Sequence, residues 1–70
     1  HLRFNLPRSN HVKIAMFDQL GRTVRDVTDS WIEIGEHIID LNLNGLSAGS
    51  YFIRFNSNER IITKSFTILN

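Results

Sequence analysis

Seventy residues suffice for one domain, and eight basic against seven acidic side chains give a net charge of only +1. This balance gives no electrostatic reason to expect nucleic acid or an anionic membrane surface as a partner. The absence of cysteine excludes disulfides and thiolate chemistry, and no apolar run approaches the roughly 20 residues of a membrane span.

Apolar and polar residues alternate along the first part of the chain, as they do in strands with one buried face. The first such run, residues 2–6, ends at Pro7, which cannot donate to a ladder. A second run covers residues 12–16 and a third covers 22–28. Between them, residues 18–21 have Asp first and Gly last, as a type I hairpin turn prefers.

The remaining segments are shorter or less regular. Residues 31–32 follow a polar break, and alternation returns over residues 37–43. Two further runs cover residues 51–55 and 60–69, separated by a polar turn. Several short strands with turn signals every 8–12 residues indicate an all-β sandwich or barrel.

Residues 46–51 carry the most informative local signal. Gly49 can adopt a positive φ, which suits a sharp corner where the chain changes sheet. Tyr51, just past that corner, can bury its ring while its hydroxyl caps an upstream backbone group, as in the tyrosine corner of Greek-key sandwiches. The sequence therefore predicts an all-β, Ig-like Greek-key β-sandwich of about seven short antiparallel strands.

The residues with metal-binding or nucleophilic side chains form no recognisable site. His1, His11 and His37 lack the close spacing of local zinc motifs, and the acidic residues around Trp31 match no calcium loop. No serine lies in a glycine-flanked nucleophile elbow. We therefore predict no catalytic residue, no metal, no cofactor and no enzyme activity. Trp31 is interpreted as a core or edge-packing residue, with a sugar-stacking role as the alternative.

Several segments, taken in order, resemble the C-terminal sorting domain (type A) of the type IX secretion system of Bacteroidota. The matching segments are Arg3–Pro7, Val12–Ile14, Phe17–Asp18, Gly21–Val24, Gly35–His37, Leu46–Tyr51, and Lys64 with Phe66–Leu69. The chain departs from the family pattern where Lys64-Ser65 replaces a basic pair and where Asn70 replaces a terminal basic residue.

The resemblance implies a non-catalytic signal that directs a cargo protein through type IX secretion for export and surface attachment. It implies that residues 1–70 are one domain truncated from a longer secreted protein. The expected partners are the outer-membrane translocon and the surface sortase machinery, with no nucleic acid and no direct membrane insertion. The expected location is secreted or cell-surface, after transit through the periplasm. An edge-strand homodimer is left open.

By the same resemblance, the recognised residues are expected in the corner and in the terminal strand: Gly49, Tyr51, Lys64, Phe66, Thr67, Ile68, Leu69 and Asn70. The competing interpretation is a carbohydrate-binding or structural Ig-like accessory module of a secreted hydrolase, because the fold alone does not settle function.

Overall fold

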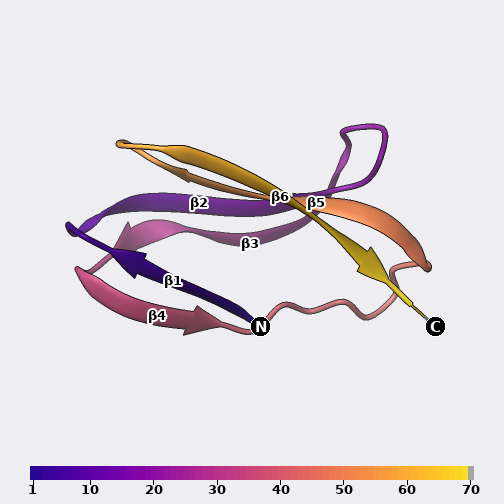
Figure 1. Cartoon of the computed structure of the whole chain (residues 1–70), viewed down its shortest axis with the longest axis horizontal. Coiled ribbons are helices and arrows are strands. Elements are labelled where there is room, and N and C mark those ends of the chain that lie inside the picture. Colours follow the sequence, from indigo (N-terminus) through magenta and orange to yellow (C-terminus); the bar gives the residue numbers. More distant parts are fainter. Residues whose placement is uncertain (70) are drawn as a thin grey trace.

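Six β-strands make up the regular structure of residues 1–69, the part of the chain described by this computed structural model (Figure 1). The strands are β1 (Leu2–Leu6), β2 (Asn10–Phe17), β3 (Thr23–Ile32), β4 (Gly35–Ile39), β5 (Gly49–Ser57) and β6 (Ile61–Ile68). No helix long and apolar enough to cross a membrane occurs within this part of the chain.

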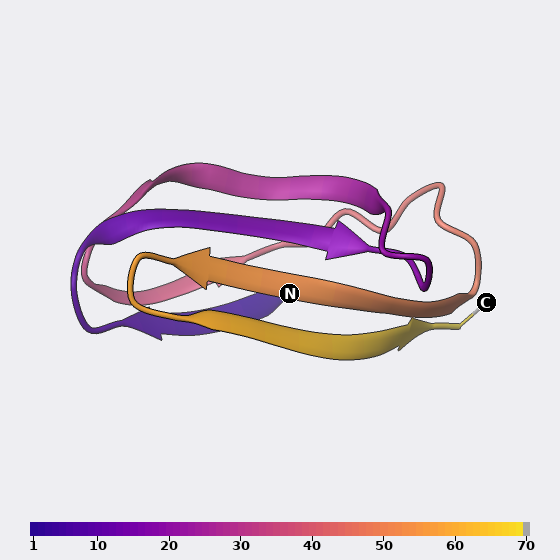
Figure 2. The same ribbon diagram turned by 90° about the horizontal axis from the view of Figure 1, so that it is seen from above.

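The strands form two antiparallel sheets that pack face to face. The larger sheet has the order β3-β2-β5-β6, and the smaller one pairs β1 with β4. Figure 2 shows the four-stranded sheet from above, with β6 along one margin and β1 beneath that side. The predicted Ig-like sandwich is confirmed, but with six strands in place of about seven.

Pairing explains why the middle of the chain differs from the prediction. Trp31 and Ile32 form no separate strand, because β2 begins early enough to pair His11 with Trp31 and Asn10 with Ile32. Strand β3 therefore runs on to Ile32. The alternation predicted for residues 37–43 continues as a strand only to Ile39. Ile39 pairs with Leu2, the first residue of β1, so β1 has no further strand residue with which the residues after Ile39 could pair.

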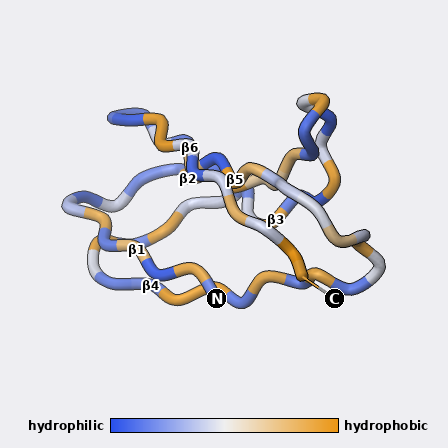
Figure 3. The backbone as a smooth tube through the Cα atoms, turned by 45° about the vertical axis from the view of Figure 1, so that its right-hand side comes forward, coloured by the Kyte–Doolittle hydropathy of each residue, from blue (hydrophilic) through white to orange (hydrophobic). Residues whose placement is uncertain are grey.

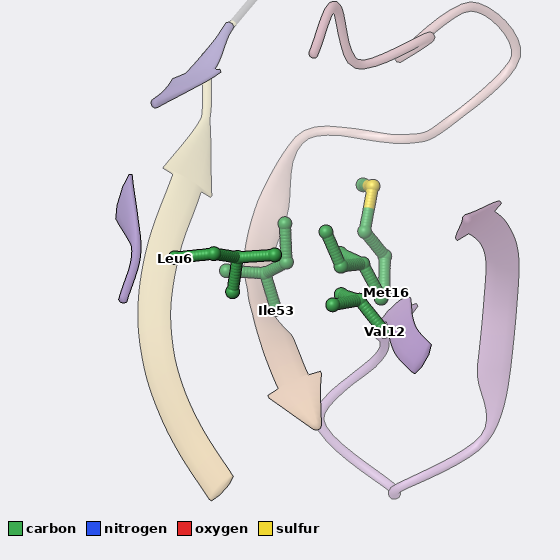
Figure 4. Close-up of a cluster of buried hydrophobic side chains, with 5 residues drawn as sticks. Leu6, Val12, Met16 and Ile53 are labelled. Carbon is green, nitrogen blue, oxygen red and sulfur yellow. The ribbon is translucent and has the colours of Figure 1, made fainter. Parts of the chain in front are cut away.

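The core lies between the two sheets and centres on β2. Val12, Ile14 and Met16 are fully buried at alternate positions of this central strand. Leu6 of β1 and Ile53 of β5 complete the buried cluster, and Figure 4 shows the Leu6 side chain pointing toward Ile53. Period-two alternation thus placed the core residues on the correct face.

An irregular segment, residues 40–48, connects the end of β4 to β5. Residues 40–48 alternate between hydrophobic and hydrophilic positions as they run toward β5 (Figure 3). Leu41 and Leu46 pack against the core. The Arg25 guanidinium donates to the carbonyl oxygens of Val24 and Asn44, which ties this segment to β3.

Candidate functional site

The corner before β5 has the geometry that the sequence predicts. The Tyr51 hydroxyl donates a 2.6 Å hydrogen bond to the Ser47 carbonyl oxygen, four residues upstream. The Tyr51 side chain is 8% exposed. Gly49 has a φ of +149°, a backbone conformation that L side chains rarely adopt. The tyrosine corner is therefore confirmed as a structural device.

Strand β6 lies beside this corner and leads to the end of the chain. It pairs with β5 in a register that sets Phe66 opposite Tyr51 and Ile68 opposite Gly49. The Tyr51 and Phe66 rings stack with centroids 5.9 Å apart. The structure thus brings four of the expected recognition residues together at one end of the sandwich.

The other expected residues are distributed differently. Thr67 lies opposite Ser50 and is exposed, and Leu69 follows β6 with 85% of its surface exposed. Lys64 lies opposite Ile53, two pairs away from Tyr51, so it is separate from the corner. Asn70 lies outside the described residues.

The hairpin between β2 and β3 is built around one carboxylate. Asp18 accepts hydrogen bonds from the backbone N–H groups of Leu20 (2.9 Å) and Arg22 (3.0 Å), and from the Arg22 side chain (2.8 Å). The backbone hydrogen bond from Arg22 is the largest of the causes that lower the pKa of Asp18, with the Arg22 side chain and the Leu20 N–H adding to it. This is the physical basis of the Asp18–Arg22 sequence pattern.

That hairpin lies beside the tyrosine corner, which sequence reasoning did not foresee. Residues 18–20 and Arg22 line one side of a shallow hollow, and residues 48–51 line the other. Leu20, at the tip of the hairpin, is 78% exposed. A large apolar side chain in a polar turn was the available sequence signal for this exposed position.

A second hollow opens between the two sheets, along β1 and β6. This β1/β6 groove has a volume of about 230 Å³ and is lined by residues of both strands, by part of β5 and by the two turns beside them. Of the expected recognition residues that the structure describes, Lys64 alone lines it. Sequence reasoning missed the groove because it depends on how the two sheets are stacked.

Trp31 lies elsewhere on the surface. Its side chain is 61% exposed, and its indole Nε1 donates to the Glu33 carboxylate at 3.3 Å. Among residues 1–69 the stacked and tilted ring pairs involve Phe4, His37, Phe55, Tyr51 and Phe66, and none involves Trp31. Trp31 is therefore not a core residue: it lies on β3, an edge strand of the larger sheet, and its ring is largely solvent-exposed.

The two histidines near Trp31 each have one polar partner, a carboxylate for His11 and a backbone carbonyl for His37. His11 Nε2 lies 2.5 Å from the Asp29 carboxylate, and His37 Nε2 lies 2.7 Å from the Glu33 carbonyl oxygen. Within the described chain, no group of three or more His, Cys, Asp or Glu side chains is arranged to hold a metal ion.

Comparison with known proteins identifies the family. The family model described as the secretion system C-terminal sorting domain matches residues 1–69. No curated protein and no solved structure matches the chain significantly.

Members of this family are sorting signals for type IX secretion, which mark proteins for export through the outer membrane to the cell surface or extracellular space. The family is in general non-catalytic, and its role implies interaction with the secretion machinery. The accessory-module alternative is not favoured. With the match covering nearly the whole chain and the sandwich fold in agreement, this chain belongs to the type IX secretion system C-terminal sorting domain family.

Proposed function

We propose that the outer-membrane translocon recognises this domain in its folded state, through the end of the sandwich that carries the corner and the terminal strand. The proposed residues are Gly49, Tyr51, Lys64, Phe66, Thr67, Ile68, Leu69 and Asn70. In this proposal residues 1–70 act as one domain at the C-terminus of a longer secreted protein, and a surface sortase removes it after export.

One observation carries the proposal. The Tyr51 ring contacts both parts of the terminal region, since its hydroxyl binds the Ser47 carbonyl oxygen and its face stacks on Phe66. Because the buried Tyr51 ring is held at both of these contacts, it fixes the direction of β6 relative to the corner. A receptor would then meet a rigid terminus, and binding would cost little conformational entropy.

Roles within this surface divide between support and contact. Gly49 and Tyr51 support the fold, because one supplies the special backbone conformation and the other is buried. Thr67 and Leu69 are exposed and therefore available for contact. Since β6 pairs only with β5 among the described strands, its outer edge also offers unpaired backbone groups for strand addition.

Export of a reporter cargo fused to the domain tests the proposal in a host with type IX secretion. Deletion of residues 64–70 should abolish export and surface attachment. Thr67→Arg should reduce export while leaving the fold intact, since Thr67 is exposed. Thr63→Arg is the matched control, because Thr63 is an exposed residue on the same strand and the same face. Normal export of the deletion variant, or equal export defects of the two threonine variants, would contradict the proposal.

An edge-strand homodimer would use the same outer edge of β6. Sedimentation of the purified domain over a range of concentrations tests this arrangement. A concentration-dependent dimer that Thr63→Pro abolishes would show that a second copy occupies the edge. A monomer at all concentrations would rule out the homodimer and leave the edge free for the secretion machinery.

A further inference from the structure

The β1/β6 groove has an apolar floor that is only partly covered. The floor is formed by side chains from three strands: Leu2, Phe4, Ile53, Phe55 and Ile62. Ile62 is 37% exposed although it lies on the core-facing side of β6, opposite Phe55. At about 230 Å³ the groove is smaller than the roughly 300–1,000 Å³ pockets that enclose small-molecule ligands. Its size fits a few side chains of an extended segment.

The rim of the groove carries more basic than acidic side chains. Arg3, Arg8, Arg60 and Lys64 line it, together with the single acid Glu59. Half of the eight basic side chains of the chain, but only one of its seven acidic ones, are therefore gathered at this groove. A chain with almost no net charge thus presents a locally positive surface.

These cations are available for an external partner. Arg8 pairs with Glu59 at 3.7 Å and Arg3 pairs with Glu36 at 3.9 Å, and both arginine side chains are more than 60% exposed. Exposed pairs of this kind bind weakly. Within the described part of the chain, Arg60 and Lys64 form no ion pair.

Backbone groups along both sides of the groove are unpaired as well. β1 pairs only with β4, and β6 pairs only with β5, among the described strands. In an antiparallel strand every second residue directs its N–H and C=O away from its partner. Figure 2 shows β1 beneath the side of the sandwich on which β6 is the last strand. The groove therefore lies between two free strand edges.

We propose that the β1/β6 groove binds an extended, acidic β-strand of a separate protein. Alternate apolar side chains of that strand would fill the apolar floor, its carboxylates would meet Arg60 and Lys64, and its backbone would pair with a free edge. A second copy docked through β6 fits less well, because its own Arg60 and Lys64, beside and within that strand, would meet the same two cations. An anionic lipid would satisfy the floor and the rim but none of the edge backbone groups.

This inference shares Lys64 and the β6 edge with the proposed recognition surface, and it goes beyond that proposal because it assigns a groove and a chemical class of occupant. The probe is a short fluorescein-labelled peptide of alternating Glu and Val, titrated with the 70-residue domain by fluorescence anisotropy. Binding should weaken as salt is added, and it should disappear for a Lys-Val peptide and for a Glu-Val peptide N-methylated at each residue. Amide resonances of residues 2–6 and 61–64 should shift on binding.

The charge of the rim is tested by one pair of variants. Lys64→Glu should weaken binding of the Glu-Val peptide by about threefold to tenfold, the effect expected of a partly exposed charge pair. Lys13→Glu is the control of equal net charge, since Lys13 is exposed on β2 and does not line the groove. Circular dichroism of both variants checks that each is folded.

Four results would overturn the groove proposal: no binding, equal binding of the Lys-Val peptide, resonance shifts confined to other strands, or binding of anionic vesicles in place of the peptide. If export still depends on residues 64–70 while the peptide fails to bind, the groove proposal is wrong and the recognition of the terminus stands.

Discussion

Removing the Tyr51 hydroxyl tests the corner that orders the terminal strand. Tyr51→Phe deletes the 2.6 Å hydrogen bond to the Ser47 carbonyl oxygen but keeps the buried ring and its stacking on Phe66. Loss of a hydrogen bond made by a buried side chain lowers the unfolding free energy by about 1–3 kcal/mol. Because Ser47 is exposed, water can reach the abandoned carbonyl, so we expect about 1–2 kcal/mol.

This loss is a large fraction of the stability of a domain of this size. At roughly 0.05–0.15 kcal/mol per residue, 70 residues give only about 4–10 kcal/mol in total. The melting temperature should fall by about 4–8 °C for each kcal/mol lost. The assay is urea unfolding followed by far-UV circular dichroism, because Trp31 is too exposed to report sensitively on the core.

Ser47→Ala is the matched control for this experiment. It keeps the backbone carbonyl that accepts the bond, so its unfolding free energy should stay within about 0.5 kcal/mol of the wild type. An unfolding curve of Tyr51→Phe that superimposes on that of the wild type would refute the structural role assigned to the hydroxyl.

Three further predictions concern the turns and the core. Gly49→Ala should destabilise the domain by about 1–3 kcal/mol in urea unfolding, because the φ of +149° is strained for alanine. A steric clash does not contribute, since the added Cβ would meet no atom within 4 Å. Unchanged stability would mean that the corner does not need glycine. Ile14→Ala, at a fully buried position of β2, should cost about 2–5 kcal/mol and reduce the dispersion of amide resonances, whereas a native-like spectrum and melting curve would be inconsistent with the packing described. Asp18 contributes stability above its unfolded pKa of 3.8, because hydrogen bonds in the hairpin lower its folded pKa, and that contribution is lost as the pH falls through the lowered value. Asp18→Asn should therefore be less stable than the wild type at neutral pH and approach it in acid, and parallel pH profiles would contradict this reasoning.

Local patterns in the sequence were enough to locate most of the strands, the β2–β3 turn and the corner. Apolar residues at every second position predicted the buried face of β2, since side chains of a strand alternate between faces regardless of what it pairs with. The hairpin at Asp18 and the corner at Gly49 and Tyr51 depend on backbone preferences within a few residues. These features needed no knowledge of distant contacts.

Only the tertiary structure decided which strands pair and where each one stops. Leu41 keeps the strand-like alternation, yet it lies outside any strand because β1 provides no partner beyond Leu2. The position of Lys64 among the apolar residues of the β1/β6 groove likewise depends on how the two sheets stack. Periodicity is a property of neighbouring residues, whereas strand partners, free edges and the clustering of charge arise from contacts between residues far apart in the chain.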